Sequence, residues 1–134
     1  MKIVNKKEFY ELPEGTLYSN YVRCSFSSLN VKQSTSYKES IPIDFIYESL
    51  IGNVDFSDLS YCDDVLLEAE KNKTSLPLDF ECGERDGMYL EDELFAIYEK
   101  QDLEDFIKKL ESLRSAFVTI DNWKYNDNGL ATLL

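Results

Sequence analysis

The residues of this 134-residue chain that could do chemistry are mainly carboxylates, because it contains 26 Asp and Glu and no His. Without imidazole there is no Ser-His or Cys-His nucleophile pair and no His-ligated zinc. Acid–base work would fall to pairs such as Asp63/Asp64 or Glu91/Glu93, but adjacency in sequence does not define a separation across a cleft. Phosphate-binding glycine motifs and the G-x-S-x-G elbow are absent. We therefore expect no enzyme, no catalytic residues and no cofactor.

Metal chemistry is only weakly indicated by the sequence. The cysteines are widely spaced and lack a C-x-x-C pair, which predicts free thiols; they are Cys24, Cys62 and Cys82. One stretch partly fits a calcium loop, whose later ligand positions, counted from Cys82, would hold Glu84, Asp86, Gly87 and Glu93. Its first position is a thiol, a poor ligand for a hard cation. We expect no metal and a solvated loop with a turn at 85–87; weak cation binding is the alternative.

The charge is unevenly distributed along the chain, whose formal net charge is −12. Residues 1–38 carry six Lys or Arg and three Glu, whereas residues 39–114 carry 21 Asp or Glu and seven Lys or Arg. A negative field repels nucleic-acid phosphates and anionic lipid and attracts a basic protein surface. No apolar run is long enough for a signal peptide or a membrane span. We expect a cytoplasmic protein that binds neither nucleic acid nor membrane.

The acidic side chains themselves are the strongest candidates for a binding surface. Carboxylates spaced over helices and a loop can imitate a phosphate backbone and occupy a groove that normally receives nucleic acid. The residues predicted to contact such a partner are Asp63, Asp64, Glu68, Glu81, Glu84, Asp86, Glu91, Asp92, Glu93 and Glu104. The alternative is that acidic faces only keep a small protein soluble. Nine Tyr and eight Phe favour binding, because aromatic side chains are enriched at interfaces.

Apolar spacing and turn residues predict one compact α+β domain over residues 1–134, with strands interspersed between helices. We expect a small antiparallel or mixed sheet with two main helices packed on one face. Helices are predicted at 6–12 with Asn5 as N-cap, at about 57–71, and at 102–115 with Asp102 as N-cap. Strands are predicted at 16–22, 29–33, 41–47, 76–81, 94–98 and 117–120. Loops or turns are predicted at the serine-rich runs 25–28 and 34–36 and at 82–87.

Three segments carry a resemblance to other proteins. They are Glu-Phe-x-x-Leu-Pro-Glu-Gly-Thr at 8–16, Cys-Gly-Glu-Arg-Asp-Gly-Met-Tyr at 82–89 and Glu-Leu-Phe-Ala-Ile-Tyr-Glu-Lys-Gln-Asp-Leu at 93–103. Over residues 6–114 the chain resembles a group of small acidic phage and mobile-element proteins that has no established activity. The resemblance therefore carries over no functional residue. It implies a setting in which accessory proteins bind and block a host factor.

These observations favour a non-enzymatic binding module, plausible as a phage-encoded inhibitor, whose acidic middle blocks a basic, nucleic-acid-binding site on a host protein. Two alternatives stay open. One is a small-molecule or nucleotide-signal binding domain in which Tyr and Trp123 line an apolar pocket. The other is an accessory protein with no discrete site.

Overall fold

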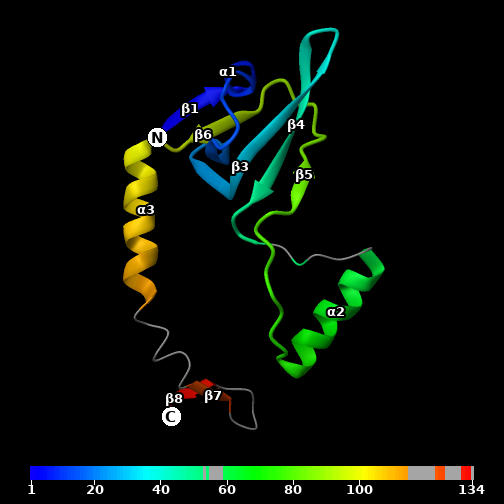
Figure 1. The fold of residues 1–134 in the computed structure, drawn as a ribbon, viewed down its shortest axis with the longest axis vertical. Coiled ribbons are helices and arrows are strands. Elements are labelled where there is room, and N and C mark those ends of the chain that lie inside the picture. The colour runs from blue at the N-terminus through cyan, green and yellow to red at the C-terminus, as the bar shows by residue number, and fades with distance from the viewer. Residues whose placement is uncertain (53, 55–58, 115–122, 126–130, 134) are drawn as a thin grey trace. The chain divides into compact units, whose positions relative to one another are not determined.

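The computed structural model (Figure 1) describes residues 1–52, 54, 59–114, 123–125 and 131–133. For residues 59–62, 123–125 and 131–133 it describes the backbone alone. The chain divides into two compact units, Met1–Tyr98 and Glu99–Leu134. Each unit is described by itself below, and the single domain expected from the sequence stays a prediction.

Six strands of the first unit form an antiparallel sheet in the order β1-β6-β2-β3-β4-β5 (Figure 1). Their bounds are β1 Lys2–Asn5, β2 Leu17–Val22, β3 Ser25–Lys38, β4 Ile41–Ser49, β5 Gly83–Arg85 and β6 Leu94–Ile97. The helices are α1 Lys6–Tyr10, α2 Leu59–Asn72 and α3 Lys100–Leu113. The α+β prediction is confirmed, and the sheet is antiparallel. Strand β6 pairs with both β1 and β2, so a late segment joins the N-terminal elements.

Four aromatic rings form the core, and each is at most 1% exposed: Phe9, Tyr18, Phe45 and Phe95. The Phe9 ring of α1 stacks on Phe95 of β6 with centroids 3.9 Å apart. Helix α1 begins at a capping box, in which Asn5 accepts a hydrogen bond from the Glu8 N–H and Glu8 accepts one from the Asn5 N–H. The predicted Asn5 cap is confirmed. It fixes where α1 begins and so directs Phe9 toward the sheet.

Two tight hairpin turns connect β2, β3 and β4. Val22 pairs with Ser25 around Arg23–Cys24, and Lys38 pairs with Ile41 around Glu39–Ser40. All four turn residues have positive φ, from 20° to 66°, as type I′ hairpin turns require. Neither turn contains the Gly or Asn that normally marks this turn type.

Strand β3 runs through both serine-rich stretches, so the loops predicted at 25–28 and 34–36 are wrong. Residues Ser25–Ser27 pair with β2, and Thr35 and Ser36 pair with β4. Pairing with one neighbouring strand, β2 for the first run and β4 for the second, holds these serine-rich stretches in β3. The predicted strands at 16–22, 41–47 and 94–98 are confirmed as β2, β4 and β6, within two residues at each end.

Short strands account for the other differences. The predicted strand at 76–81 is absent apart from an isolated bridge residue, Asp79, and β5 lies inside the predicted turn at 82–87. Strand β1 has no counterpart among the predicted strands. Both β1 and β5 are short strands at the edges of the sheet. Each is a strand because it pairs with a neighbouring strand, and its own residues give no strand pattern. The strand predicted at 117–120 lies outside the described residues.

Helix α2 confirms the predicted helix at 57–71 within two residues. Helix α3 begins at Lys100, so the predicted Asp102 N-cap is wrong: Glu99 precedes the helix, and Asp102 accepts a hydrogen bond from the Glu99 N–H at 2.8 Å. Strands β7 (Trp123–Tyr125) and β8 (Ala131–Leu133) form a hairpin in the second unit. Among the residues described, none of the helices combines the length and the apolar character that crossing a membrane requires.

Candidate functional site

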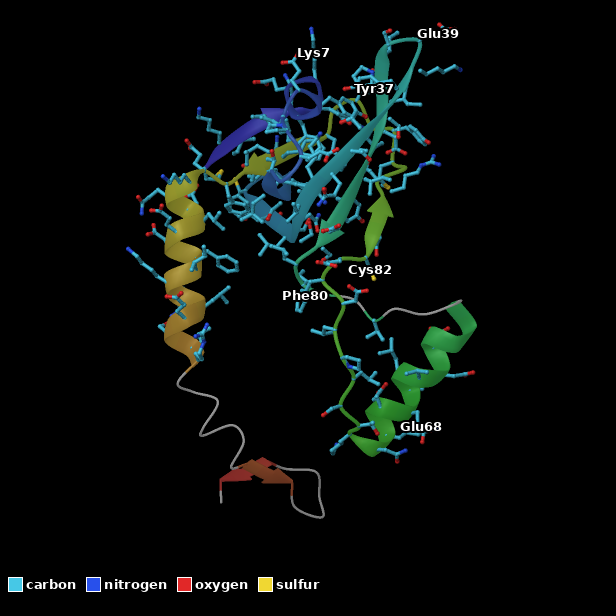
Figure 2. All side chains as sticks on the ribbon, viewed as in Figure 1. Lys7, Tyr37, Glu39, Glu68, Phe80 and Cys82 are labelled. Atoms are coloured by element: carbon cyan, nitrogen blue, oxygen red, sulfur yellow. The ribbon has the colours of Figure 1, made fainter. Side chains whose placement is uncertain are left out.

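The ten carboxylates predicted from the sequence lie on three segments. Helix α2 carries Asp63, Asp64 and Glu68, the stretch between α2 and β6 carries Glu81, Glu84, Asp86, Glu91, Asp92 and Glu93, and α3 carries Glu104. Eight are exposed, whereas Asp86 and Glu93 are half-buried. Figure 2 labels Glu68 on α2. The six carboxylates between α2 and β6 belong to one stretch that includes the sheet strand β5, whereas the other four lie on the separate helices α2 and α3.

Residues 79–93, here called the acidic segment, combine seven carboxylates with a single arginine. Four large apolar or aromatic side chains of this segment have 47–58% of their surface exposed: Phe80, Met88, Tyr89 and Leu90. Figure 2 labels Phe80 at its beginning. Glu81, Glu91 and Asp92 are exposed and form no ion pair within the described part of the chain. The acidic segment is therefore both charged and apolar at its surface.

Asp44 of β4 anchors the acidic segment to the sheet. It is 4% exposed and accepts hydrogen bonds from the Phe45 N–H, from the Gly87 N–H at 3.0 Å and from Arg85 Nε. Burial by itself raises the pKa of Asp44, but the two N–H groups and the Arg85 guanidinium outweigh it and lower the pKa below the usual 3.8. The Asp86 N–H also donates to the Phe45 carbonyl at 3.0 Å. Asp44 thus stays ionised and holds the turn at 85–87 in place.

A second charged cluster links α1 to the end of the acidic segment. Lys6 Nζ lies 3.4 Å from Glu93 Oε2 and 5.9 Å from the centroid of the Tyr10 ring. Burial raises the pKa of Glu93, and the neighbouring Asp86 raises it further against the opposing effect of Lys6. Burial also raises the pKa of Asp86. The carboxylates here are crowded and partly desolvated, so the field around Lys6 is negative.

An open groove lies between α1, the β3–β4 hairpin and the acidic segment. Its volume is about 560 Å³, and it is lined by Lys6, Lys7, Tyr10, Glu11, Tyr37, Ile41, Pro42 and Glu91. A neighbouring hollow of about 200 Å³ shares four of these residues and extends to Tyr89 and Leu90. Figure 2 labels Lys7 on α1 and Tyr37 on β3 at this end of the sheet. The Trp123 side chain, which the sequence predicts in a small-molecule pocket, lies outside the described side chains.

The partial calcium pattern adopts a different structure from a metal-binding loop. Glu84 lies on β5 and accepts a hydrogen bond from the Tyr47 hydroxyl at 2.9 Å. Cys82 Sγ donates to Asp79 Oδ2 at 3.2 Å. Within the ranges that the structure describes, no three His, Cys, Asp or Glu side chains are grouped so that they could hold a metal ion. Cys24 and Cys82 form no disulfide within the described residues, and the Cys62 side chain is not described.

The sequence did not single out Asp44, Lys6, Tyr10 or the groove. The signal for Asp44 was an aspartate, a residue with low strand propensity, between the apolar residues Ile43 and Phe45 of a strand. Lys6 and Tyr10 stand in the first and last positions of a short helix, and nothing local distinguishes them from solvated residues. Their partners Glu93 and Asp86 are about 80 residues away, so only the fold brings them together.

Comparisons of the chain with protein-family models, with curated proteins and with solved structures found no match.

Proposed function

We propose that this protein is a non-enzymatic protein-binding module that uses the acidic segment to contact a basic surface on a partner protein. The observation that carries the proposal is the exposure of large apolar side chains beside carboxylates that form no ion pair among the described residues. Phe80 precedes Glu81, and Met88, Tyr89 and Leu90 directly precede Glu91 and Asp92. A surface that only maintained solubility would gain from the carboxylates and lose from the exposed apolar groups.

Aromatic side chains and Met are enriched at the centres of protein interfaces, and charged residues surround them. In the acidic segment the apolar groups would supply most of the binding energy. The carboxylates would select a positively charged partner and accelerate the encounter. The hydrogen bonds from Arg85 and Gly87 to Asp44 hold this surface on the sheet, which lowers the entropy lost on binding.

The wider form of the proposal is that the partner surface is one that normally binds nucleic acid, and that the chain blocks it as a phage-encoded inhibitor. The excess of carboxylates over residues 39–114 supports a positively charged partner surface, as nucleic-acid-binding sites are. Helix α2, with Asp63, Asp64 and Glu68, and Glu104 of α3 would extend the same negative field. We also propose that α2 and α3 pack on one face of the sheet.

The test is affinity capture from a bacterial lysate, followed by measurement of the dissociation constant with each captured protein after purification. We expect a basic partner whose affinity falls when NaCl is raised from about 0.05 M to about 0.5 M. The triple variant Glu81→Gln, Glu91→Gln, Asp92→Asn should bind about tenfold more weakly, because it removes three exposed charges at the contact.

The matched control is Glu39→Gln, Glu70→Gln, Glu111→Gln, which removes three exposed carboxylates outside the acidic segment. We expect the control to retain most of the affinity. Equal losses in the two triple variants, or an affinity that does not depend on salt, would contradict the proposal.

A further inference from the structure

The groove beside the acidic segment presents aromatic and aliphatic surface that the fold does not cover. Tyr37 and Ile41 are 61% and 63% exposed, although both belong to a paired region of the β3–β4 hairpin. Pro42 and the half-buried Tyr10 complete this lining. A ring from α1 and a ring from β3 therefore line one depression, held in position by the core packing of Phe9 and Phe45.

The charges around the groove leave a negative excess. Lys6 is paired with Glu93, so it contributes little net charge. Glu11, which follows α1, and Glu91 of the acidic segment both line the groove, are exposed and have no ion-pair partner within the described residues. Lys7 is the remaining exposed cation among the lining residues.

The pKa of Tyr10 also indicates a negative potential inside the groove. Burial, which is the largest cause, raises its pKa together with Asp44, Asp86 and Glu93 to about 12. Burial disfavours a charge of either sign, whereas the field of the three carboxylates disfavours an anion and favours a cation.

We propose that this groove binds an arginine side chain presented by the basic partner, with the guanidinium against the rings of Tyr10 and Tyr37 and hydrogen-bonded to Glu91. This inference rests on the proposed function, because it names the anchor residue that the acidic segment recruits. Glu11, which also lines the groove, stabilises the same charge at longer range.

Arginine fits this lining better than lysine. Its planar, weakly hydrated guanidinium stacks on aromatic faces and can form two parallel hydrogen bonds to one carboxylate. The acidic segment already contains one such contact, since Arg85 Cζ lies 5.6 Å from the centroid of the Tyr89 ring. An ammonium ion would have to lose a tighter hydration shell to enter the same apolar surface.

The experiment is an NMR titration of the ¹⁵N-labelled protein with the peptide acetyl-Ala-Gly-Arg-Gly-Ala-amide at millimolar concentration. Two further peptides replace Arg by citrulline, which has the same shape without the charge, or by Glu. We expect the Arg peptide to shift the backbone amide signals of Lys7, Tyr10, Tyr37 and Glu91, and to bind about tenfold more tightly than the citrulline peptide. Groove signals that do not move, equal binding of the Arg and citrulline peptides, or tighter binding of the Glu peptide at Lys7 would overturn the inference.

Two variants and one control locate the contact. Tyr37→Leu and Glu91→Gln change exposed side chains, so their spectra should remain those of the folded protein, and each should weaken the Arg peptide several-fold. Glu14→Gln removes an exposed carboxylate that belongs neither to the groove lining nor to the acidic segment, and it should leave the peptide affinity unchanged. Equal effects of Glu91→Gln and Glu14→Gln would overturn the inference.

The captured partner separates this inference from the proposed function. If the partner binds Tyr37→Leu as tightly as the wild type but loses affinity for the triple variant of the acidic segment, the groove inference is wrong and the proposed function stands. If the triple variant binds as tightly as the wild type, the proposed function fails. The peptide titration of the groove then still decides whether an arginine binds there.

Discussion

Lys32 places a charge inside the core at an energetic cost. Its side chain is 2% exposed, and its Nζ lies 5.8 Å from the centroid of the Phe9 ring. Nζ donates to Thr35 Oγ1 at 2.9 Å and to the Gln33 carbonyl at 3.5 Å, and no carboxylate in the described part of the chain forms an ion pair with it. Burial lowers the pKa of Lys32. The ammonium form is therefore less favoured in the folded than in the unfolded chain.

We expect Lys32→Met to stabilise the protein at pH 7 by about 1 kcal/mol, because it removes the desolvation cost of a buried charge and keeps the side-chain volume. Between the lowered pKa of Lys32 in the folded chain and its ordinary value of 10.5, the unfolded chain binds more of the Lys32 proton than the folded chain does. The contribution of Lys32 to wild-type stability therefore improves as the pH rises toward 10.5, and the advantage of the variant shrinks. Urea denaturation between pH 7 and about pH 10 measures this. Lys38→Met, at an exposed position, is the control, and a destabilised Lys32→Met variant would show that the two hydrogen bonds of Nζ outweigh its burial cost.

At the scale of elements, the two hairpins are held by pairing rather than by favourable turn residues. Glu39 and Ser40 have φ of 53° and 66°, a region that costs ordinary side chains about 1 kcal/mol and costs glycine almost nothing. The β3–β4 pairing extends from Lys38 and Ile41 beside the turn to Asn30 and Ser49, and it compensates for the strained turn.

Replacing this turn by Glu39→Asn, Ser40→Gly should raise the free energy of unfolding by about 1 kcal/mol, since Asn-Gly is the preferred type I′ pair. Chemical denaturation of the variant and the wild type measures the difference. Ser36→Gly makes the same Ser-to-Gly change inside β3, where φ is not positive, and should instead destabilise by about 0.5–1 kcal/mol. If both glycine substitutions lower stability, the turn is not the strained site that its backbone angles indicate.

For the sheet as a whole, one buried and two half-buried tyrosines from three elements determine the response to alkaline pH. Burial raises the pKa of Tyr10 of α1 and of Tyr47 of β4 to about 12 each, and the carboxylate of Glu84 contributes at Tyr47. Burial raises the pKa of Tyr18 of β2 still further. In the unfolded chain these phenols would lose their protons near pH 10. The folded state therefore holds protons that the unfolded state has released.

Because the folded state keeps these phenolic protons above pH 10, the stability that the three tyrosines contribute should be fully present below that pH and be lost as the pH rises from 10 to 12. Urea denaturation at successive pH values, with the ultraviolet absorbance of phenolate as a second signal, measures this. Tyr47→Phe should flatten the loss, whereas Tyr37→Phe, at an exposed ring, should leave it unchanged. A wild-type stability that is constant across this range would contradict the assignment.

The sequence predicted the elements whose signals are local. The Asn5 cap, strands β2, β4 and β6 and helix α2 all follow from capping and apolar spacing within about a dozen residues. It was wrong where pairing overrides composition, as in the serine-rich runs of β3, and where turns lack glycine, as at Glu39–Ser40. The sequence placed the N-cap of α3 three residues too late. The pairs Asp102–Asp105 and Glu99–Asp102 have the same three-residue spacing of acids, so both resemble a capping box.

By itself, the sequence determined the sign and the uneven distribution of charge, the absence of imidazole chemistry, and the acid-rich composition of residues 79–93, since all of these are sums over local residue types. Only the tertiary structure decided which charges are buried and what they contact. Asp44 meets Gly87, Lys6 meets Glu93, and Tyr10 and Tyr37 line one groove with Glu91. These contacts join residues 27 to 87 positions apart in the sequence. The energy of each contact depends on the burial of its groups and on the distance between them, and both are set only when the sheet forms.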